Sequence, residues 1–539
     1  MSTIKFINTS LGLHARDFVR FAKRRLKFEL APYRVEVDIR DKKNGGSKKA
    51  AWHVLPPHLV FSEVYHRSEA AFHDLLGCDE RHSTFWKRAQ IQMDAWYRNH
   101  PVASLFHHND CATSEVKAIR IFGDDGVASR HRSFHAIHWS SDFPGTPFNS
   151  QIPFYNIDKD QLVPGKTEPQ LQQVLVWSLQ ALLHGRHPHT DHLGMAWKDP
   201  CFAAIAGQPL AGPYRAALVG VLADMKWQFE HFRWNEFDPS CSHVGNHPCW
   251  LCTIQREHLA DFSFDAPSRD HGLYMGSAAA AASPLSSIPG FHMSQVWVEP
   301  MHAGGLGVAS HICGNILVEL SGLQVFAPKA QGEWKLELDH QLQHAHVNFV
   351  AWAKANFIQH SQKKFSANMV DMHVKGKSWP MLKAKAANCF CVLQYLVDVL
   401  APRKEMSEQA MLQYLTARGC DTFFRVWRQA EDPDWLNPEE LAKFKQAGEE
   451  LFTCYNRLSS LAAAGHRARW AVKPKLHALI HLYRDILATS RNGASRWSFA
   501  DEDQMGRQGK LAAKTNINAQ SSAVLFRWLI AFFESIPIA

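Results

Sequence analysis

The amino-acid sequence predicts a mixed α/β protein, and three observations support this fold class. Short apolar or aromatic runs over residues 117–160 predict a β-meander. A helical pattern over residues 168–195 precedes a continuous apolar run, AALVGVLAD. From about residue 305 to 490, nearly every periodic segment has helical spacing. Hydrophobic residues make up 46% of the 539 residues and aromatic residues 11%, which excludes a chain disordered throughout.

The first segment, residues 1–50, is a basic arm. It carries 13 Lys and Arg against 5 Asp and Glu, whereas the other 489 residues balance at 46 against 46. Gly-Gly-Ser between lysine pairs predicts a flexible linker or loop. The run KRR is a localisation signal, a nucleic-acid contact or a solvated helix face. Its residues and the first lysine pair are candidate DNA contacts: Lys23, Arg24, Arg25, Lys42 and Lys43.

The remaining elements follow in order. Residues 51–115 have helical spacing, interrupted at Gly77 and Pro101. In the meander, VKAIRIFGDDG is followed by SFHAIHWSS and SQIPFYNI. The next helix has Gly185 as its expected end. The run AALVGVLAD fits a buried strand or the end of a buried helix.

Composition also indicates the cellular setting. No window reaches the roughly 18 uninterrupted apolar residues of a transmembrane helix, so we expect no membrane association. The N-terminus lacks the order of a signal peptide. The 11 Cys are scattered and odd in number, which favours a reducing compartment, the nucleus or the cytosol, over a disulfide framework.

Acidic residues after apolar runs are candidate ligands for a hard cation such as Mg²⁺, which prefers rigidly held carboxylates. Asp124 and Asp125 follow the first predicted strand, and Asp224 ends the later apolar run. The competing explanations are an Asp-Gly turn for the first pair and a helix cap for Asp224.

A third acidic group, Asp501-Glu502-Asp503, begins a late helix. Acids in a first helical turn also complement the helix dipole without any function. Arg507 and Lys510 follow in the next turns, and this mixed-charge face is a candidate contact for a phosphate backbone.

Cysteine and histidine residues indicate a second kind of metal site. Cys249 and Cys252 have the Cys-x₂-Cys spacing that binds one tetrahedral Zn²⁺, with Cys241, His243 or His247 as further ligands. The alternative is a chance cluster, since the chain contains 32 His.

Downstream, Glu299 and His302 stand three residues apart and precede a glycine-rich run. This spacing allows them to share a site or to ligate a metal. The alternative is that both are structural.

The order of these motifs resembles the transposases of the CACTA-like group of cut-and-paste DNA elements, and most closely their divergent relatives in protists and fungi. The resemblance covers roughly residues 117–515. GDDG and ADMKW match the family's first two acidic motifs, CWLC its Cys-x₂-Cys, and DEDQMGRQGKL its late acidic helix. EPMH with LGVASHICGNIL matches the entry to the family's insertion, except that Glu299 replaces Asp or Cys. PKLHALIHL, with Pro474, His477 and His481, resembles the segment that returns from it.

The resemblance implies an RNase H-like catalytic core interrupted by a large all-α insertion. Asp124 or Asp125, Asp224 and Glu502 would hold Mg²⁺ (or Mn²⁺) for DNA cleavage and strand transfer, beside a possible structural Zn²⁺. Double-stranded DNA, as transposon ends and target, would be the partner of a nuclear homo-oligomer. The implied segments are the arm 1–50, a helical region 51–115, the first core part 116–236, a Cys/His patch and linker 237–300, the insertion 301–472 and the last core part 473–539.

Three alternatives remain open. The chain is a degenerate or domesticated, catalytically inactive DNA-binding protein, a structural protein whose helical block binds partners, or a hydrolase of another class. The last has no motif in its favour, because the chain lacks a nucleophile elbow, a Walker loop, a Rossmann fingerprint and a His-Glu-x-x-His motif.

Overall fold

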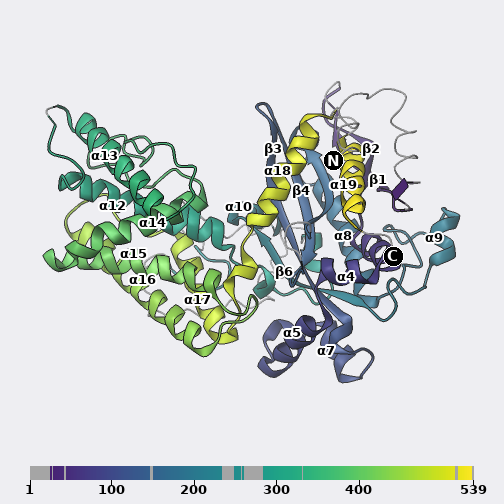
Figure 1. Ribbon diagram of the computed structural model, residues 1–539. Helices are drawn as coiled ribbons and strands as arrows, with labels where there is room; N and C mark the ends of the chain where they lie inside the picture. Colours follow the sequence, from purple (N-terminus) through teal and green to yellow (C-terminus); the bar gives the residue numbers. More distant parts are fainter. Residues whose placement is uncertain are drawn as a thin grey trace. The chain divides into compact units, whose positions relative to one another are not determined.

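The computed structural model divides the chain into two compact units (Figure 1). Unit 1 comprises Met1–Arg233, Met275–Val296 and Phe499–Ala539, and unit 2 comprises Trp234–Tyr274 and Trp297–Ser498. Unit 2 therefore interrupts unit 1 in the sequence. The structure describes residues 25–26, 28–41, 44–145, 150–232, 248–255, 258–259, 283–330, 332–515 and 520–536.

A four-stranded sheet forms the centre of unit 1, which confirms a mixed α/β class. The strands are β3 (Val116–Ser129), β4 (Arg132–Ser141), β5 (Ile152–Asp158) and β6 (Arg215–Ala223), in the order β5-β4-β3-β6. The first three strands pair antiparallel as the predicted meander, and β6 pairs parallel with β3. On its other side, β6 forms an isolated parallel bridge between Val221 and Val296.

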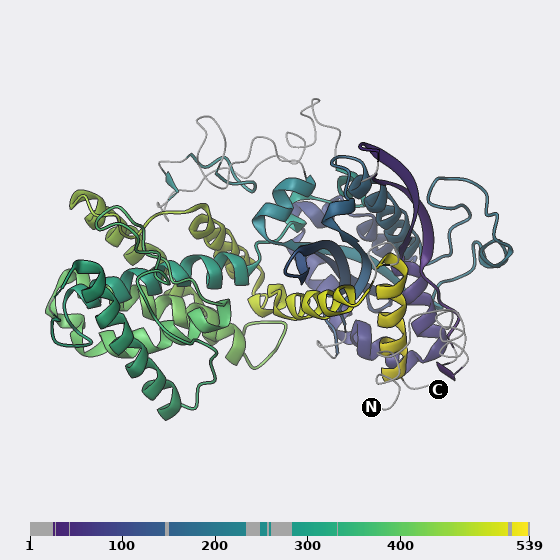
Figure 2. The ribbon, with the colours of Figure 1, turned by 90° about the horizontal axis from the view of Figure 1, so that it is seen from above.

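Helices cover this sheet because each has one apolar face to bury. The helix α8 (Thr167–His184) links β5 to β6, as parallel pairing requires, and ends at Gly185, whose φ of 67° favours glycine. After β6 comes α10 (Met225–Phe232). The two C-terminal helices are α18 (Phe499–Ala513), packed on β3 and β4, and α19 (Gln520–Ser535), packed on β5 and β2. They lie at a steep angle to each other (Figure 2).

The described part of the N-terminal arm contains a hairpin that the sequence did not predict. Its strands β1 (Tyr33–Arg40) and β2 (Ser47–Val54) turn at Gly45 and Gly46, so the Gly-Gly-Ser segment is a tight turn, which agrees with a loop and not with a linker. The predicted boundary at residue 50 lies inside β2. The physical reason is the alternation of buried Val35, Val37 and Ile39 along β1, which packs against α8. The other helices of unit 1 are α3 (Pro57–Arg67), α4 (Glu69–Leu76), α5 (Asp79–Gln92), α6 (Ala95–Arg98), α7 (Pro101–His107) and α9 (Pro200–Ile205).

The long elements that the structure describes in unit 2 are helices. A π-helix, η7 (Met301–Ala309), runs directly into α12 (Ser310–Gly322). The others are α13 (Trp334–Ala355), α14 (Ala386–Leu400), α15 (Glu408–Gln429), α16 (Pro438–Ala464) and α17 (Pro474–Thr489). The unit extends to Ser498, so α17 belongs to it, whereas the sequence analysis placed residues 473–539 in the other part.

One stretch, Met301–Gly322, is long and apolar enough by composition to cross a membrane. Most of its most apolar window, 83%, is buried inside the structure. A core helix of a globular protein has the same properties, so this stretch is weak evidence for a membrane span.

Candidate functional site

Asp224 directly follows the last residue of β6, and Asp124 lies within the neighbouring parallel strand β3, beside the point where β6 ends. In the register of β3 and β6, Gly123 is opposite Ala223, and each is followed by one of the two aspartates. Parallel pairing thus places two residues that are 100 positions apart in sequence at one edge of the β6 strand. The side chain of Asp124 is buried and that of Asp224 is partly buried.

Glu502 reaches the same place from α18. The carboxyl group of Asp124 shares a hydrogen bond with Glu502 and also feels the charge of Asp224. The helix approaches β3 closely because residue 509 is glycine: a Cβ there would lie 2.5 Å from the carbonyl oxygen of Val127. The structure therefore places Asp124 in interaction with both Glu502 and Asp224.

The electrostatics of Asp124 are unusual for an aspartate. Burial, the hydrogen bond with Glu502 and the nearby charges of Glu502 and Asp224 raise the pKa of Asp124 to about 8. Near neutral pH, one proton therefore holds this carboxyl group neutral among the acids. A divalent cation bound among these acids would displace that proton, because carboxylate oxygens are ligands for such cations.

The two aspartates of the GDDG motif have different surroundings. Asp125 is exposed and forms an ion pair with Lys159, and Lys226 lies 3.9 Å away. Successive residues of a strand point to opposite faces, so only one of the pair can face α18. The structure places Asp124 with Glu502 and leaves Asp125 outside the group.

The three consecutive acids of α18 are separated in the same way. Asp501 is buried and pairs with Arg120 of β3 at 3.4 Å, so it anchors the helix to the sheet. Asp503 is exposed and pairs with Arg507 at 2.8 Å. Only Glu502 is left to interact with Asp124.

Asp224 has a second role as a helix cap. Its Oδ1 accepts a hydrogen bond of 2.6 Å from the backbone N–H of Trp227 in α10, as the competing sequence explanation expected. The Trp227 ring packs over Gly123, where a Cβ would lie 2.1 Å from the ring. Its Nε1–H donates to Nε2 of His135 at 2.6 Å. Trp227 thus fixes the segments that carry both aspartates.

A group that the sequence analysis missed lies beside Trp227. One ligand atom each from His135, Glu168 and His231 lies within 4.8 Å of the others. Nε2 of His135 accepts the hydrogen bond from Trp227, and its Nδ1 lies 2.9 Å from Glu168 and 2.9 Å from the hydroxyl of Tyr155. These contacts make the group part of a hydrogen-bonded network.

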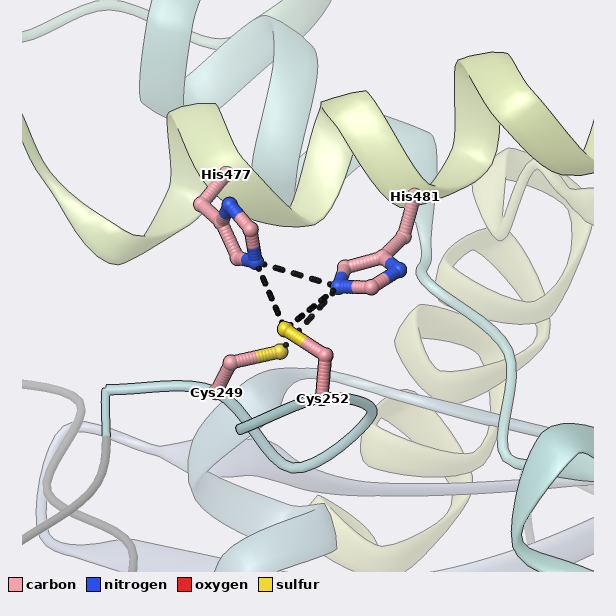
Figure 3. A group of neighbouring side chains, drawn as sticks. All are labelled: Cys249, Cys252, His477 and His481. Carbon is pink, nitrogen blue, oxygen red and sulfur yellow. Dashed lines mark hydrogen bonds between the residues drawn. The ribbon is translucent and has the colours of Figure 1, made fainter. Parts of the chain in front are cut away.

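A second group with metal-ligand geometry is formed in unit 2 by Cys249, Cys252, His477 and His481 (Figure 3). The two histidines are four residues apart on α17, so they share one helix face. Nε2 of His477 lies 3.2 Å from the Cys252 sulfur, and Nε2 of His481 lies 3.3 Å from both sulfurs. A tetrahedral Zn²⁺ with bonds of about 2.0–2.3 Å separates its ligands by roughly 3.3–3.8 Å, which is close to these distances.

The chemistry of these four residues also suits a soft divalent cation. Hydrogen bonds from Cys249, His477 and His481 lower the pKa of Cys252, whereas burial and the neighbouring sulfur raise that of Cys249. One thiolate therefore forms readily and the second does not. A cation between the sulfurs removes this conflict. Apolar packing by Ile254, Leu259 and their neighbours surrounds the two cysteines.

Glu299 and His302 do not join either group. The buried carboxylate of Glu299 accepts hydrogen bonds from the backbone N–H groups of Met301, His302 and Ser498 and contacts Nδ1 of His302 at 2.7 Å. These contacts occupy both carboxylate oxygens. The structural explanation therefore accounts for this pair: Glu299 caps the start of the π-helix η7, and the predicted metal role is not supported.

The other predicted positions are distributed as follows. Arg25 and Lys510 are exposed, and Arg507 pairs with Asp503. The remaining candidates lie outside the described residues: Lys23, Arg24, Lys42, Lys43, Cys241, His243 and His247. His477 and His481 were not predicted as ligands, although a His-x₃-His spacing on a helix was the signal available for them.

No protein-family model matches the chain, and no curated protein matches it in sequence.

Proposed function

We propose that this protein is a transposase-like, metal-dependent enzyme that cleaves DNA and transfers its strands. The observation that carries the proposal is the interaction of Asp124 with both Asp224 and Glu502. These residues come from two parallel strands and a helix, across sequence gaps of 100 and 278 residues. Separate ion pairs of Asp125, Asp501 and Asp503 account for the neighbouring acids, which leaves one acid from each motif for the site.

The order of elements supports the same proposal. An antiparallel meander, a crossover helix, a parallel strand and a helix follow one another from β3 to α10, and Val296 forms a short parallel bridge beside β6. A helical unit then intervenes before α18. We interpret unit 1 as an RNase H-like core and unit 2 as its insertion, since this order and the acidic positions are those that the resemblance implies.

The residues of the site fit a hard divalent cation. Mg²⁺ or Mn²⁺ held there would polarise a phosphate and lower the pKa of a bound water or 3′-hydroxyl. Asp124, Asp224 and Glu502 would hold the cation, and Asp124 would release its proton on binding it. In the described residues their ligand atoms are not all within 4.8 Å of one another.

We also propose a structural Zn²⁺ at Cys249, Cys252, His477 and His481. Four protein ligands leave no open coordination position, as in structural rather than catalytic zinc sites. The ion would join the segment around Cys249 to α17, which are more than 200 residues apart. Metal analysis of the purified protein should find one zinc, lost in Cys252→Ser and retained in Cys201→Ser, which changes an exposed cysteine outside the group. Full zinc content in Cys252→Ser would contradict this assignment.

The catalytic proposal is tested by nicking of supercoiled plasmid in Mg²⁺ or Mn²⁺. We expect Asp124→Asn, Asp224→Asn and Glu502→Gln each to abolish nicking, because each removes a charged ligand. Asp125→Asn and Asp503→Asn are the matched controls, because both acids are exposed neighbours outside the group. Equal activity in a site variant and its neighbouring control would refute the assignment. Retained DNA binding without nicking in the unaltered protein would favour the inactive, DNA-binding alternative.

A further inference from the structure

Unit 2 carries a concentration of lysines that the proposed chemistry does not use. Residues 357–385 contain six lysines and one acid, Asp371, and residues 466–475 contain two lysines, two arginines and no acid. The rest of residues 297–498 contains 14 Lys and Arg against 17 Asp and Glu. The positive charge of this unit therefore lies in two short segments.

The first segment is an ordered loop with its own packing. Residues 357–385 connect α13 to α14 without regular secondary structure, yet Phe365, Val370 and Leu382 are buried. The backbone N–H of Met381 donates to Val370, and that of Lys383 donates to Met369, so the two arms of the loop are joined. Long ordered loops with an internal core are commonly functional.

The two basic segments meet at α12 and the π-helix before it. The side chain of Asn315 receives a hydrogen bond from the backbone of Trp470 and donates one to Pro380, which joins both segments to one residue. A Cβ at Gly305 would lie 2.8 Å from Ala386, and a Cβ at Gly307 would lie 2.8 Å from Lys475. The ends of the two segments therefore flank the same turn of helix.

The lysines are available to an external anion. Lys363, Lys364, Lys375, Lys377, Lys385 and Lys473 are all exposed. None of the six has a carboxylate partner within ion-pair distance among the described residues, whereas Lys383 pairs with Asp371. Mutual repulsion of so many unpaired cations is unfavourable unless a polyanion binds them.

We propose that the surface formed by residues 357–385 and 466–475, here called the lysine surface, binds the phosphate backbone of DNA separately from the carboxylate site. Lysine is a point charge that neutralises phosphates without reading bases, so binding here would be independent of sequence. The choice of DNA among polyanions rests on the proposed function. The lysine surface would hold a duplex during cleavage, and its contribution does not require a divalent cation.

The test compares two variants of the full chain that lose the same charge. The lysine-surface variant carries Lys375→Gln, Lys377→Gln, Lys385→Gln and Lys473→Gln. The control variant carries Lys329→Gln, Lys335→Gln, Lys354→Gln and Lys445→Gln, four lysines of unit 2 outside both segments. Binding to a short DNA duplex of arbitrary sequence is measured in EDTA over a series of salt concentrations.

We expect the lysine-surface variant to bind more weakly and to flatten the plot of log K against log salt by about 3 to 4, close to one unit for each lost phosphate contact. The control variant should keep the slope of the unaltered protein. Equal effects of the two variants would overturn the proposal, since net charge alone would then explain them. Stronger, lysine-dependent binding to anionic-lipid vesicles than to DNA would also overturn it, in favour of a membrane surface.

This result is separable from the catalytic proposal. At low salt and saturating DNA, the lysine-surface variant should still nick plasmid, because Asp124, Asp224 and Glu502 are unchanged. If the variant binds DNA as the unaltered protein does while Asp124→Asn abolishes nicking, the lysine surface is refuted and the catalytic site stands. If the lysine-surface variant binds DNA more weakly but neither it nor the unaltered protein nicks DNA, the lysine surface stands and the catalytic site is refuted.

Discussion

Asp124→Asn is expected to abolish metal-dependent activity and, at the same time, to stabilise the folded protein at neutral pH. Asparagine is nearly the same size as the protonated aspartic acid that it replaces. Its oxygen can still accept the 2.7 Å hydrogen bond from the backbone N–H of Asp125, and its amide can donate to Glu502 as the acid proton does. The substitution therefore retains the contacts of the site and removes only its ionisation.

The magnitude follows from the pKa of Asp124, which burial and its acidic neighbours raise from 3.8 to about 8. Between these two values the folded protein keeps a proton that the unfolded chain releases. The stability that this group contributes is full below pH 3.8 and is lost as the pH rises toward 8. At pH 7 the loss amounts to at most about 4 kcal/mol, at about 1.4 kcal/mol for each pH unit above the unfolded value. Asparagine does not ionise, so the variant avoids this loss.

Urea unfolding at pH 5 and pH 8 in EDTA measures the effect. We expect the free energy of unfolding to fall between these pH values more steeply in the unaltered protein than in Asp124→Asn. Asp125→Asn is the matched control, because Asp125 is exposed and paired with Lys159 on the other face of the strand, and it should leave the pH slope unchanged. Adding Mg²⁺ should stabilise the unaltered protein and Asp125→Asn, but not Asp124→Asn, since ligands stabilise only the state that binds them.

Two outcomes would refute this reasoning. If Asp124→Asn is less stable than the unaltered protein at pH 8 in EDTA, the carboxyl group is not a buried acid held among acids. If Mg²⁺ shifts the unfolding of Asp124→Asn as much as that of the unaltered protein, Asp124 is not a ligand, whatever its pKa.

Two further perturbations test how the site is held in place. Gly123→Ala introduces a Cβ that would lie 2.1 Å from the Trp227 ring, so we expect destabilisation of about 1–3 kcal/mol and loss of nicking; a variant as stable and active as the unaltered protein would contradict the close packing. Arg120→Met leaves the buried carboxylate of Asp501 on α18 without its cationic partner. Urea unfolding should therefore show a free energy of unfolding lower by about 3–5 kcal/mol. Arg507→Gln, which breaks an exposed pair on the same helix, should cost less than about 1 kcal/mol, and equal losses in the two variants would exclude a special role for the buried pair.

The sequence predicted the secondary structure of the later segments more accurately than that of the basic arm. The meander, the helix ending at Gly185 and the helical block were all evident from local periodicity, and the described elements agree with them. The Gly-Gly-Ser stretch of the arm was predicted to be a flexible linker or loop because Gly and Lys dominate residues 42–49. The alternation of Val35, Val37 and Ile39 was the overlooked signal for the hairpin.

By itself, the sequence determined which residue types were available and which local element carries each of them. It identified Asp124, Asp125, Asp224, Glu502 and the Cys-x₂-Cys pair, because those patterns involve neighbours along the chain. It left open which aspartate of the GDDG motif faces the other acids, since that depends on which face of β3 is covered by α18. Only the tertiary structure decided this.

The same distinction applies to the cysteines. Their partners, His477 and His481, lie more than 200 residues away and are brought to Cys249 and Cys252 by the packing of α17. Local periodicity records the burial of a residue and the element in which it lies. It does not record contacts between distant segments, because many pairings of elements bury the same apolar faces equally well, and the packing of the folded chain selects one of them.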